Sequence, residues 1–512
     1  MKTPILGSTY VTRSVNAADA RMVNLFPEII PEAGKEPAFL QRAPGLKFTQ
    51  TIGLGPIRGL WTFSNASAVA FVVSGTELYK INTSYVATKI GDVSGTGPVS
   101  IADNGTQLFI ACNGPSFIYN NTTNVFQQIT DPDFPGAVTV GYLDGYFVFN
   151  EPNSQRIWVT SLLNGTDIDP LDFASAEGAP DGVAGLIIDH REAWVFGTNS
   201  VEVWYNAGGA DFPLQRIQGA FNEIGCVAPY SIAKLDNGLF WLGADARGQG
   251  IVYRANGYTG QRISTHAVEW QIQQYSNLSD AIAYTYQQDG HAFYVLIFPS
   301  ANTTWVYDVS TQAWHERAGF DNGAFTRHRS NCQMAFNGDV IVGDFKSGNI
   351  YALDLDTYAD NSQIQKWLRS WRALPTGQNN LKRTAQHSLQ LDCESGVGLN
   401  GLEVTQVINL QTELDETLIT ESDETLITDQ YAYLTQGANP EVMLRWSDDG
   451  GHTWSNEHWA SIGKIGQFYR RVFWRRLGMT LKLRDRVYEI SGTDPVKIAI
   501  VGAELQLSGT NA

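Results

Sequence analysis

The chain has little charge and few cysteines for its length. Of its 512 residues only 17% are charged, and 52 acidic residues outnumber 35 basic ones to give a net charge of -17. With 43% hydrophobic and 12% aromatic residues, the composition is that of a globular protein, which excludes intrinsic disorder, a coiled coil and a collagen-like rod. The shortage of Lys and Arg argues against tight binding of duplex DNA or an anionic membrane, because neutralising phosphate requires clustered cations.

The cysteines and the apolar runs exclude two further classes. Cys112, Cys226, Cys332 and Cys393 lie far apart and form no C-x-x-C pair, so neither a zinc site nor a disulfide framework is indicated. Free, mostly buried thiols in a reducing compartment are expected. The longest apolar runs, such as residues 68–73, reach about a third of the roughly 20 residues of a membrane helix, and no signal-peptide core is found at the amino terminus. The sequence predicts neither secretion nor membrane insertion.

A hairpin unit recurs along the first 360 residues. It consists of an apolar strand, a turn rich in Gly, Asn or Ser, and a second strand with an aromatic residue. These aromatic residues follow one another at intervals of 39 to 54 residues, at Tyr79, Tyr119, Trp158, Trp204, Tyr253, Tyr307 and Tyr351. Because both faces of each short sheet are apolar, each sheet needs a neighbour on either side, which a radial arrangement provides. The sequence predicts an all-β fold with a β-propeller of about seven blades, six or eight being alternatives; an elongated β-solenoid or two separate sandwiches is the competing arrangement.

The prediction divides the chain into three parts. Residues 1–50, with Pro and Gly between short motifs, are expected to form an extended arm, and residues 51–360 the propeller. Residues 361–512 are β-rich without the hairpin unit and predict a C-terminal domain like a β-sandwich. Within it, residues 413–420 (ELDETLIT) and 421–428 (ESDETLIT) are near copies. This tandem acidic octad predicts a hairpin or loop that projects from the sheet.

One turn motif in the last part is specific. The S-x-D-x-G-x-T-W pattern of an Asp-box is present at Ser447, Asp449, Gly451, Thr453 and Trp454. In such a turn the carboxylate accepts backbone N–H bonds, the glycine adopts positive φ and the Trp packs under the hairpin. We expect a structural role. A sialidase would show several boxes and an arginine cluster facing a Tyr/Glu pair, so a sialidase-like or glycan-binding propeller is the alternative hypothesis.

Signatures of catalysis and metal binding are missing from the sequence. His291, His315 and His328 have no second histidine at a ligand spacing, and packed or hydrogen-bonded histidines are expected. Residues 167–172 resemble a calcium loop superficially but lack its glycine and terminal Glu. Nucleophile elbows, phosphate loops and dinucleotide fingerprints are also missing. The sequence predicts a protein that is not an enzyme, with no catalytic residue, cofactor or metal.

The carboxyl-terminal part is basic, unlike the rest of the chain. Residues 461–512 hold nine Lys and Arg against four Asp and Glu, a local net charge of +5. Arg470, Arg471, Arg475 and Arg476 are interleaved with aromatic residues, as in platforms that bind single-stranded nucleic acid. The favoured interpretation is a strand whose arginines meet carboxylates at a subunit contact. These four arginines are the candidate interface with another subunit or with an adaptor.

Ten short motifs lie in order along nearly the whole chain, at residues 24–28, 43–46, 169–177, 196–204, 290–299, 304–308, 314–316, 447–454, 473–478 and 491–497. Together they resemble the packaged-DNA stabilisation proteins, or tail nozzle (hub) proteins, of short-tailed bacteriophages. The acidic octad resembles an insertion relative to that pattern. The resemblance carries no catalytic residues with it.

The resemblance implies a structural protein of the virion tail that is made in the host cytoplasm. It would assemble as a homo-oligomeric ring, a hexamer, below the portal and its adaptor, the head-to-tail connector. The ring would close the DNA channel and retain packaged DNA until ejection, with a tail needle as plug and tailspikes or fibres docked around it. Duplex DNA is expected to pass through without specific binding.

Overall fold

The computed structural model describes residues 1–512 except 15–17, 33, 210–211, 246–247, 376–382, 401–403, 410–426, 434–435, 481–485 and 510–512. The chain divides into two units. The propeller unit comprises Ser8–Phe26 and Ala43–Gln363, and the sandwich unit comprises Met1–Gly7, Pro27–Arg42 and Ile364–Ala512.

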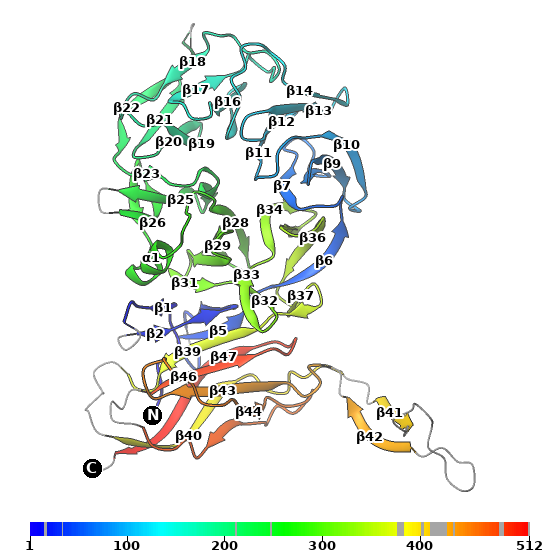
Figure 1. Cartoon of the computed structure of the whole chain (residues 1–512), viewed down its shortest axis with the longest axis vertical. Coiled ribbons are helices and arrows are strands. Elements are labelled where there is room, and N and C mark those ends of the chain that lie inside the picture. Colours follow the sequence, from blue (N-terminus) through cyan, green and yellow to red (C-terminus); the bar gives the residue numbers. More distant parts are fainter. Residues whose placement is uncertain are drawn as a thin grey trace. The chain divides into compact units, whose positions relative to one another are not determined.

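Seven antiparallel sheets stand around a central axis in the propeller unit (Figure 1). Each of the first four blades has four strands. Their order along the chain is also their order from the central axis outward. They are β7 (Ile57–Thr62), β8 (Val69–Ser74), β9 (Glu77–Asn82) and β10 (Ala87–Asp92); β11 (Ser100–Asp103), β12 (Gln107–Ala111), β13 (Ser116–Asn120) and β14 (Val125–Gln128); β15 (Val140–Leu143), β16 (Tyr146–Asn150), β17 (Arg156–Val159) and β18 (Phe173–Ser175); and β19 (Val183–Asp189), β20 (Glu192–Gly197), β21 (Val201–Asn206) and β22 (Leu214–Asn222).

The last three blades vary this plan. Their strands are β23 (Gly225–Cys226), β24 (Ala233–Leu235), β25 (Gly238–Asp245), β26 (Gly248–Asn256) and β27 (Thr259–Arg262); β28 (Ile282–Gln288), β29 (His291–Phe298), β30 (Thr303–Asp308) and β31 (Ala313–Glu316); and β34 (Ser330–Phe336), β35 (Asp339–Asp344), β36 (Asn349–Asp354) and β6 (Gly45–Thr51).

Short elements connect and flank the blades. The 3-10 helix η1 (Pro229–Ser231) precedes β24, and the helix α1 (His266–Gln273) follows β27 with Thr265 as its N-cap. The remaining strands of the unit are β1 (Tyr10–Val11), β2 (Asp19–Ala20), β3 (Met22–Val23), β32 (Ala318–Asp321), β33 (Ala324–Arg327) and β37 (Ala359–Asp360). Strands β4 (Leu25–Ile29) and β38 (Gln363–Ile364) each span a boundary between the units.

The aromatic residues that mark the sequence repeat all lie in the third strand of a blade, which confirms the predicted propeller and its seven repeats. Two of them are bonded to a carboxylate near the preceding turn: Trp158 Nε1 donates to Glu151 at 3.1 Å and Tyr351 Oη to Asp344 at 2.7 Å. The apolar faces pack from blade to blade. Phe71 of the first blade, for example, shares a core with Leu108 of the second.

The seventh blade receives its outermost strand from near the amino terminus. Strand β6 pairs antiparallel with β36, with Leu46 opposite Leu353. Both leucines are buried in a core that also contains Tyr351 and Phe26. Because β6 is followed directly along the chain by β7 of the first blade, its hydrogen bonds to the last blade close the circle of sheets.

The sandwich unit has two sheets. Their strand orders are β4 (Leu25–Ile29), β5 (Ala38–Arg42), β47 (Ala499–Gly509), β40 (Thr384–Cys393) and β45 (Val472–Arg475) in one, and β39 (Trp367–Arg372), β46 (Val487–Gly492), β43 (Glu441–Ser447) and β44 (His458–Ser461) in the other. Trp367, Trp371, Tyr488 and Leu389 are among its buried residues. The predicted sandwich-like domain is confirmed. Strands β41 (Val404–Asn409) and β42 (Ile427–Tyr433) pair with each other, and residues 413–426 of the acidic octad lie outside the described residues.

Buried arginines tie the sandwich unit together. The guanidinium of Arg42 donates to Gln365 Oε1 at 3.0 Å and to the carbonyl of Val496 at 3.0 Å. Arg369 Nε donates to the carbonyl of Ile5 at 2.7 Å, and burial lowers the pKa of Arg369 to about 10. These bonds fix segments that are far apart in the sequence.

The segment predicted as an arm, residues 1–50, is divided between the two units. Residues 1–7 and 27–42 belong to the sandwich unit, where Leu40 of β5 pairs with Ile500 of β47. Residues 8–26 and 43–50 belong to the propeller unit, and the second of these segments includes most of β6. The physical reason is that β36 and β47 each present an open edge, whose backbone groups need a partner strand.

Replacing Leu46 by Ala should lower the free energy of unfolding by about 2–5 kcal/mol, because the side chain is fully buried in the closing strand. The matched control is Lys47→Ala, which changes the next residue of the same strand, where the side chain is exposed. Chemical denaturation followed by tryptophan fluorescence gives both values. Equal losses in the two variants would contradict closure by β6.

Candidate functional site

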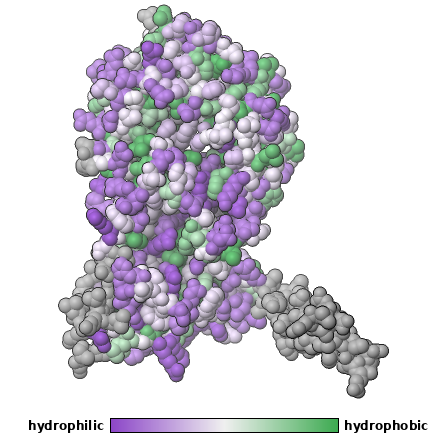
Figure 2. Space-filling view, in the orientation of Figure 1, coloured by the Kyte–Doolittle hydropathy of each residue, from purple (hydrophilic) through white to green (hydrophobic). Residues whose placement is uncertain are grey.

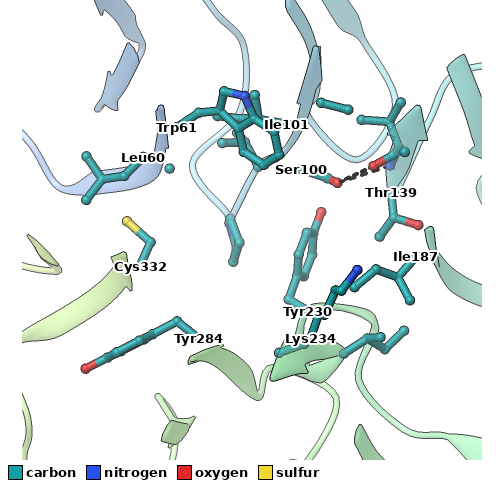
Figure 3. Close-up of a pocket in the computed structure, with 18 of the residues that line it drawn as sticks. Leu60, Trp61, Ser100, Ile101, Thr139, Ile187, Tyr230, Lys234, Tyr284 and Cys332 are labelled. Carbon is teal, nitrogen blue, oxygen red and sulfur yellow. Dashed lines mark hydrogen bonds between the residues drawn. The ribbon is translucent and has the colours of Figure 1, made fainter. Parts of the chain in front are cut away.

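A cavity of about 610 Å³ lies where the innermost strands of the seven blades face one another (Figure 3). Each blade contributes to its lining. The side chains include Leu60 of β7, Ile101 of β11, Val140 of β15, Ile187 of β19, Lys234 of β24, Tyr284 of β28 and Cys332 of β34. The lining is mostly apolar, as the inner strands of a propeller require for blade packing.

The charged groups of this cavity are already engaged by other parts of the propeller. Arg58 donates to the carbonyls of Gly97, Gly75 and Ser94 at 2.6, 2.9 and 3.0 Å. Lys234 Nζ lies 2.6 Å from Asp189 Oδ1. The bonds of Arg58 compensate the burial that lowers the pKa of its guanidinium. The cavity therefore holds one satisfied arginine where a sialidase site would need a cluster.

The acidic group of the lining is also hydrogen-bonded within the propeller, and a phenol group of the lining is held neutral by burial. Asp103 accepts a hydrogen bond from Trp61 Nε1 at 2.6 Å and from the backbone of Gly105 at 2.9 Å. Burial raises the pKa of Tyr230 to about 12, so its hydroxyl stays protonated at neutral pH. Among the described residues of the lining, Asp103 is the only carboxylate, so the lining lacks the pair of carboxylates that glycoside hydrolysis commonly uses.

The three histidines considered from the sequence are packed in the propeller. His291 Nδ1 lies 2.8 Å from Asp308, and His328 Nδ1 lies 2.6 Å from the hydroxyl of Ser330. Burial and three nearby arginines lower the pKa of His328 to about 3, and burial holds the pKa of His315 well below its usual range. Both are neutral at physiological pH. Among the described residues, no group of three or more His, Cys, Asp or Glu could hold a metal ion.

The Asp-box residues form one closed turn after β43. The carboxylate of Asp449 accepts hydrogen bonds from the Ser447 hydroxyl at 2.6 Å, the Thr453 backbone at 2.9 Å and the Thr453 hydroxyl at 2.6 Å. Gly451 has φ of +104° and donates to Ser447 Oγ at 2.8 Å. Trp454 lies under the guanidinium of Arg445 at 4.7 Å. Ser447, Asp449, Gly451 and Thr453 all take part in the hydrogen bonds of the turn, and Trp454 packs against Arg445 of β43.

The hydrogen bonds of this turn act on the charge of Asp449. Bonds from Ser447 and Thr453 stabilise the carboxylate and hold the pKa of Asp449 well below its usual range. The neighbouring Asp448 is held separately, by two bonds from Arg486 at 2.6 and 2.8 Å. The turn is therefore anchored to Arg486, the residue before β46, as well as to itself.

The four candidate interface arginines lie on or beside β45, an edge strand of the sandwich unit, and all four are exposed. Arg475 lies over the ring of Phe473 at 5.0 Å, and Arg476 adopts a left-handed backbone with φ of +59°. Among the residues that the structure describes, none of the four has an ion-pair partner. A groove of about 690 Å³ is lined by Arg475 and Arg476 together with Phe473 and Met479.

The sequence did not predict the exposure of two apolar segments. The loop before β45 exposes Ile465, Phe468 and Tyr469, and the loop between β17 and β18 exposes several leucines. Most of the face of the propeller unit seen in Figure 2 is hydrophilic, with hydrophobic patches between. Sequence patterns could not separate such residues from core residues, because their exposure depends on which strands cover them.

All four cysteines are free, Cys112 and Cys226 being buried. Among the described residues, no helix has the length and apolar character needed to cross a membrane.

Two protein-family models match this chain. The family described as bacteriophage P22 Gp10, beta-propeller, matches residues 1–358, and the one described as bacteriophage P22 Gp10, beta-sandwich, matches residues 411–508. The chain belongs to the P22 Gp10 family. Its two units correspond in type to the two parts of that family.

Individual relatives of this Gp10-family chain are distant. The tail hub protein gp10 of Salmonella phage P22 is 22% identical over 303 residues, which are 56% of this chain and 60% of that protein. The match thus spans less than two thirds of the length of the relative.

Two solved structures illustrate the similarity, both at low sequence identity. A virginiamycin B lyase from Staphylococcus aureus is 12% identical, with 60% of this chain and 98% of that one covered and a TM-score of 0.39. An extracellular domain of a putative one component system from B. thetaiotaomicron is also 12% identical, with 87% and 58% covered and a TM-score of 0.41.

Replacing Asp449 by Asn should lower the melting temperature of the sandwich unit at neutral pH by about 2–4 °C, because the turn loses its carboxylate acceptor. A depressed pKa contributes stability above the unfolded value of about 3.9, and this contribution is lost as the pH falls through the lower folded value. The difference between the variant and the original chain should therefore shrink below about pH 4. Calorimetry across pH measures it, with the exposed His452→Asn as control. A difference that is constant with pH would contradict the role of the charge.

Proposed function

We propose that this chain is a structural protein of the virion tail of a short-tailed phage, where it forms the ring-shaped tail nozzle or hub. The observation that carries the proposal is the family match, which covers both the propeller and the sandwich. The relative from phage P22 bears the name tail hub protein. The sequence resemblance described above points to the same role.

In the proposed assembly, copies of the chain form a ring, a hexamer, below the portal and its adaptor. The ring closes the DNA channel and retains packaged DNA, with a tail needle as its plug, until ejection. Tailspikes or fibres bind to its outer surface. A propeller suits this use because each blade is held by two neighbours, which gives a rigid support for large partners.

Charge supports passage of DNA without binding. The chain has a net charge of -17, and acidic walls repel phosphate within a Debye length of about 8 Å at physiological salt. Retention then comes from the plug that fills the channel, since a wall with affinity for phosphate would slow the DNA during ejection.

A sialidase-like or glycan-binding propeller is the alternative. The Asp-box favours it, but the box lies in the sandwich unit, and the propeller cavity has a single arginine among its described lining residues. Hydrolysis of a fluorogenic sialoside or retention on a glycan array would favour this alternative over the tail hub.

The purified full chain, of 56.4 kDa, should form a ring, alone or when its adaptor is added. Native mass spectrometry gives the copy number, and negative-stain electron microscopy shows the ring. A chain that stays monomeric both alone and with the adaptor would contradict the proposed role as a tail nozzle.

The full chain should show no measurable binding to duplex DNA at physiological ionic strength, because acidic residues outnumber basic ones. A gel-shift titration with duplexes of unrelated sequence measures this. Retardation at micromolar protein would reject the repulsive channel while leaving the oligomeric ring untouched.

A further inference from the structure

The sandwich unit exposes a surface that combines arginines with large apolar side chains. We call it the basic–aromatic surface; it consists of Ile465, Phe468, Tyr469, Arg470, Arg471, Arg475 and Arg476. Phe468 is 77% and Tyr469 82% exposed. Aromatic and arginine side chains are the residues that most often carry binding energy at protein interfaces. Their exposure in the single chain points to a partner that covers them.

The propeller unit exposes a loop of the opposite character at its rim. This leucine loop, residues 160–172, joins β17 to β18, the outermost strand of the third blade (Figure 1). Leu162, Leu163 and Leu171 are 60%, 61% and 76% exposed. Three carboxylates, of Asp167, Asp169 and Asp172, lie in this loop. Two more lie in the connection between β14 and β15: Asp131, whose Oδ2 accepts from the backbone of Ile168, and Asp133, whose backbone donates to Asp131.

The leucine loop is a built structure. Asp131 Oδ2 accepts a hydrogen bond from the backbone of Ile168 at 3.2 Å. This bond joins the leucine loop to the connection between β14 and β15. The Ser161 hydroxyl donates to Asp167 at 2.7 Å, and the backbone of Leu163 donates to Gly145 at 2.7 Å. Leu163 has φ of +59°. This conformation is uncommon for leucine and persists only where the surrounding structure holds it.

The two surfaces have complementary charges that the chain leaves uncompensated. Among the residues that the structure describes, none of the five carboxylates and none of the four arginines forms an ion pair. Burial and the neighbouring charge of Asp169 raise the pKa of Asp172, as expected for carboxylates that lack a cation. The carboxylates do not converge on a metal, since no metal-binding group occurs among the described residues.

We infer that copies of this chain contact one another head to tail, the basic–aromatic surface of one copy covering the leucine loop of the next. The inference rests on the proposed ring. Two surfaces of the same sign would repel, so a two-fold contact of either surface with itself is disfavoured. A contact between two different surfaces of one chain is heterologous, and it generates a ring when the rotation closes.

A charge-swap experiment with the full chain tests this contact. One variant carries Arg470→Glu and Arg471→Glu, and the other carries Asp133→Lys and Asp172→Lys. The structure shows no side-chain hydrogen bond of these four residues within its described part, so the changes leave each surface's own bonding intact. Each variant alone brings like charges together, and we expect half-assembly to need a concentration about 100-fold higher or more.

Mixing the two variants should restore assembly. In an alternating ring, one contact has the original charges and the next has them exchanged, so both are attractive. Native mass spectrometry of the mixture, with one variant isotopically labelled, shows alternating composition. The matched control is Glu223→Lys with Asp356→Lys, which makes the same charge change at exposed positions elsewhere on the propeller unit and should assemble normally.

Three outcomes would overturn the inference. Each single variant could assemble as the original chain does, the mixture could stay unassembled, or assembly could return only when both swaps are made in one chain, which would indicate a contact within the chain. In each case a ring formed by the original chain would leave the proposed function standing. If the original chain itself forms no ring, the proposed function fails and not only this contact.

Discussion

Burial of both faces of every sheet is the constraint on which the propeller unit depends. A four-stranded sheet with apolar residues on its two faces cannot cover itself, so each blade is stable only between two others. The constraint is cyclic, because Ile57 and Leu60 of the first blade need the core that Ile341 and Ile350 of the seventh provide. Pairing of β6 with β36 holds those two blades together by main-chain hydrogen bonds.

The two kinds of arginine in the sandwich unit illustrate a second constraint. Arg42 and Arg369 are buried, and backbone carbonyls or amides meet their guanidinium groups. A buried charge without such partners would cost several kcal/mol. Arg470 and Arg475 face solvent, where a charge costs nothing and remains available to a partner. The buried arginines therefore hold the sandwich unit together, whereas the exposed arginines remain available to bind a partner.

Local motifs were predictable because their bonding is local. The Asp-box needs eight consecutive residues, and its bonds run between Ser447, Asp449 and Thr453. The repeat of aromatic residues was readable for a similar reason, since each of them sits at the same place in a contiguous hairpin. The exposure of Tyr469 or Leu171 was not readable, because an apolar residue in a loop looks the same in the sequence whether or not a strand covers it.

The amino-acid sequence alone is sufficient to predict the all-β class, the propeller repeat, the Asp-box turn and the excess of positive charge near the carboxyl terminus. These depend on neighbours in the chain, on periodicity and on composition. Long-range packing sets three other features: Leu46 closes the last blade, residues 27–42 belong with the carboxyl-terminal strands, and the leucines of the leucine loop are exposed. Those outcomes arise from pairing between strands hundreds of residues apart, and the free energy of such pairing is set by which edges remain open once every blade has formed.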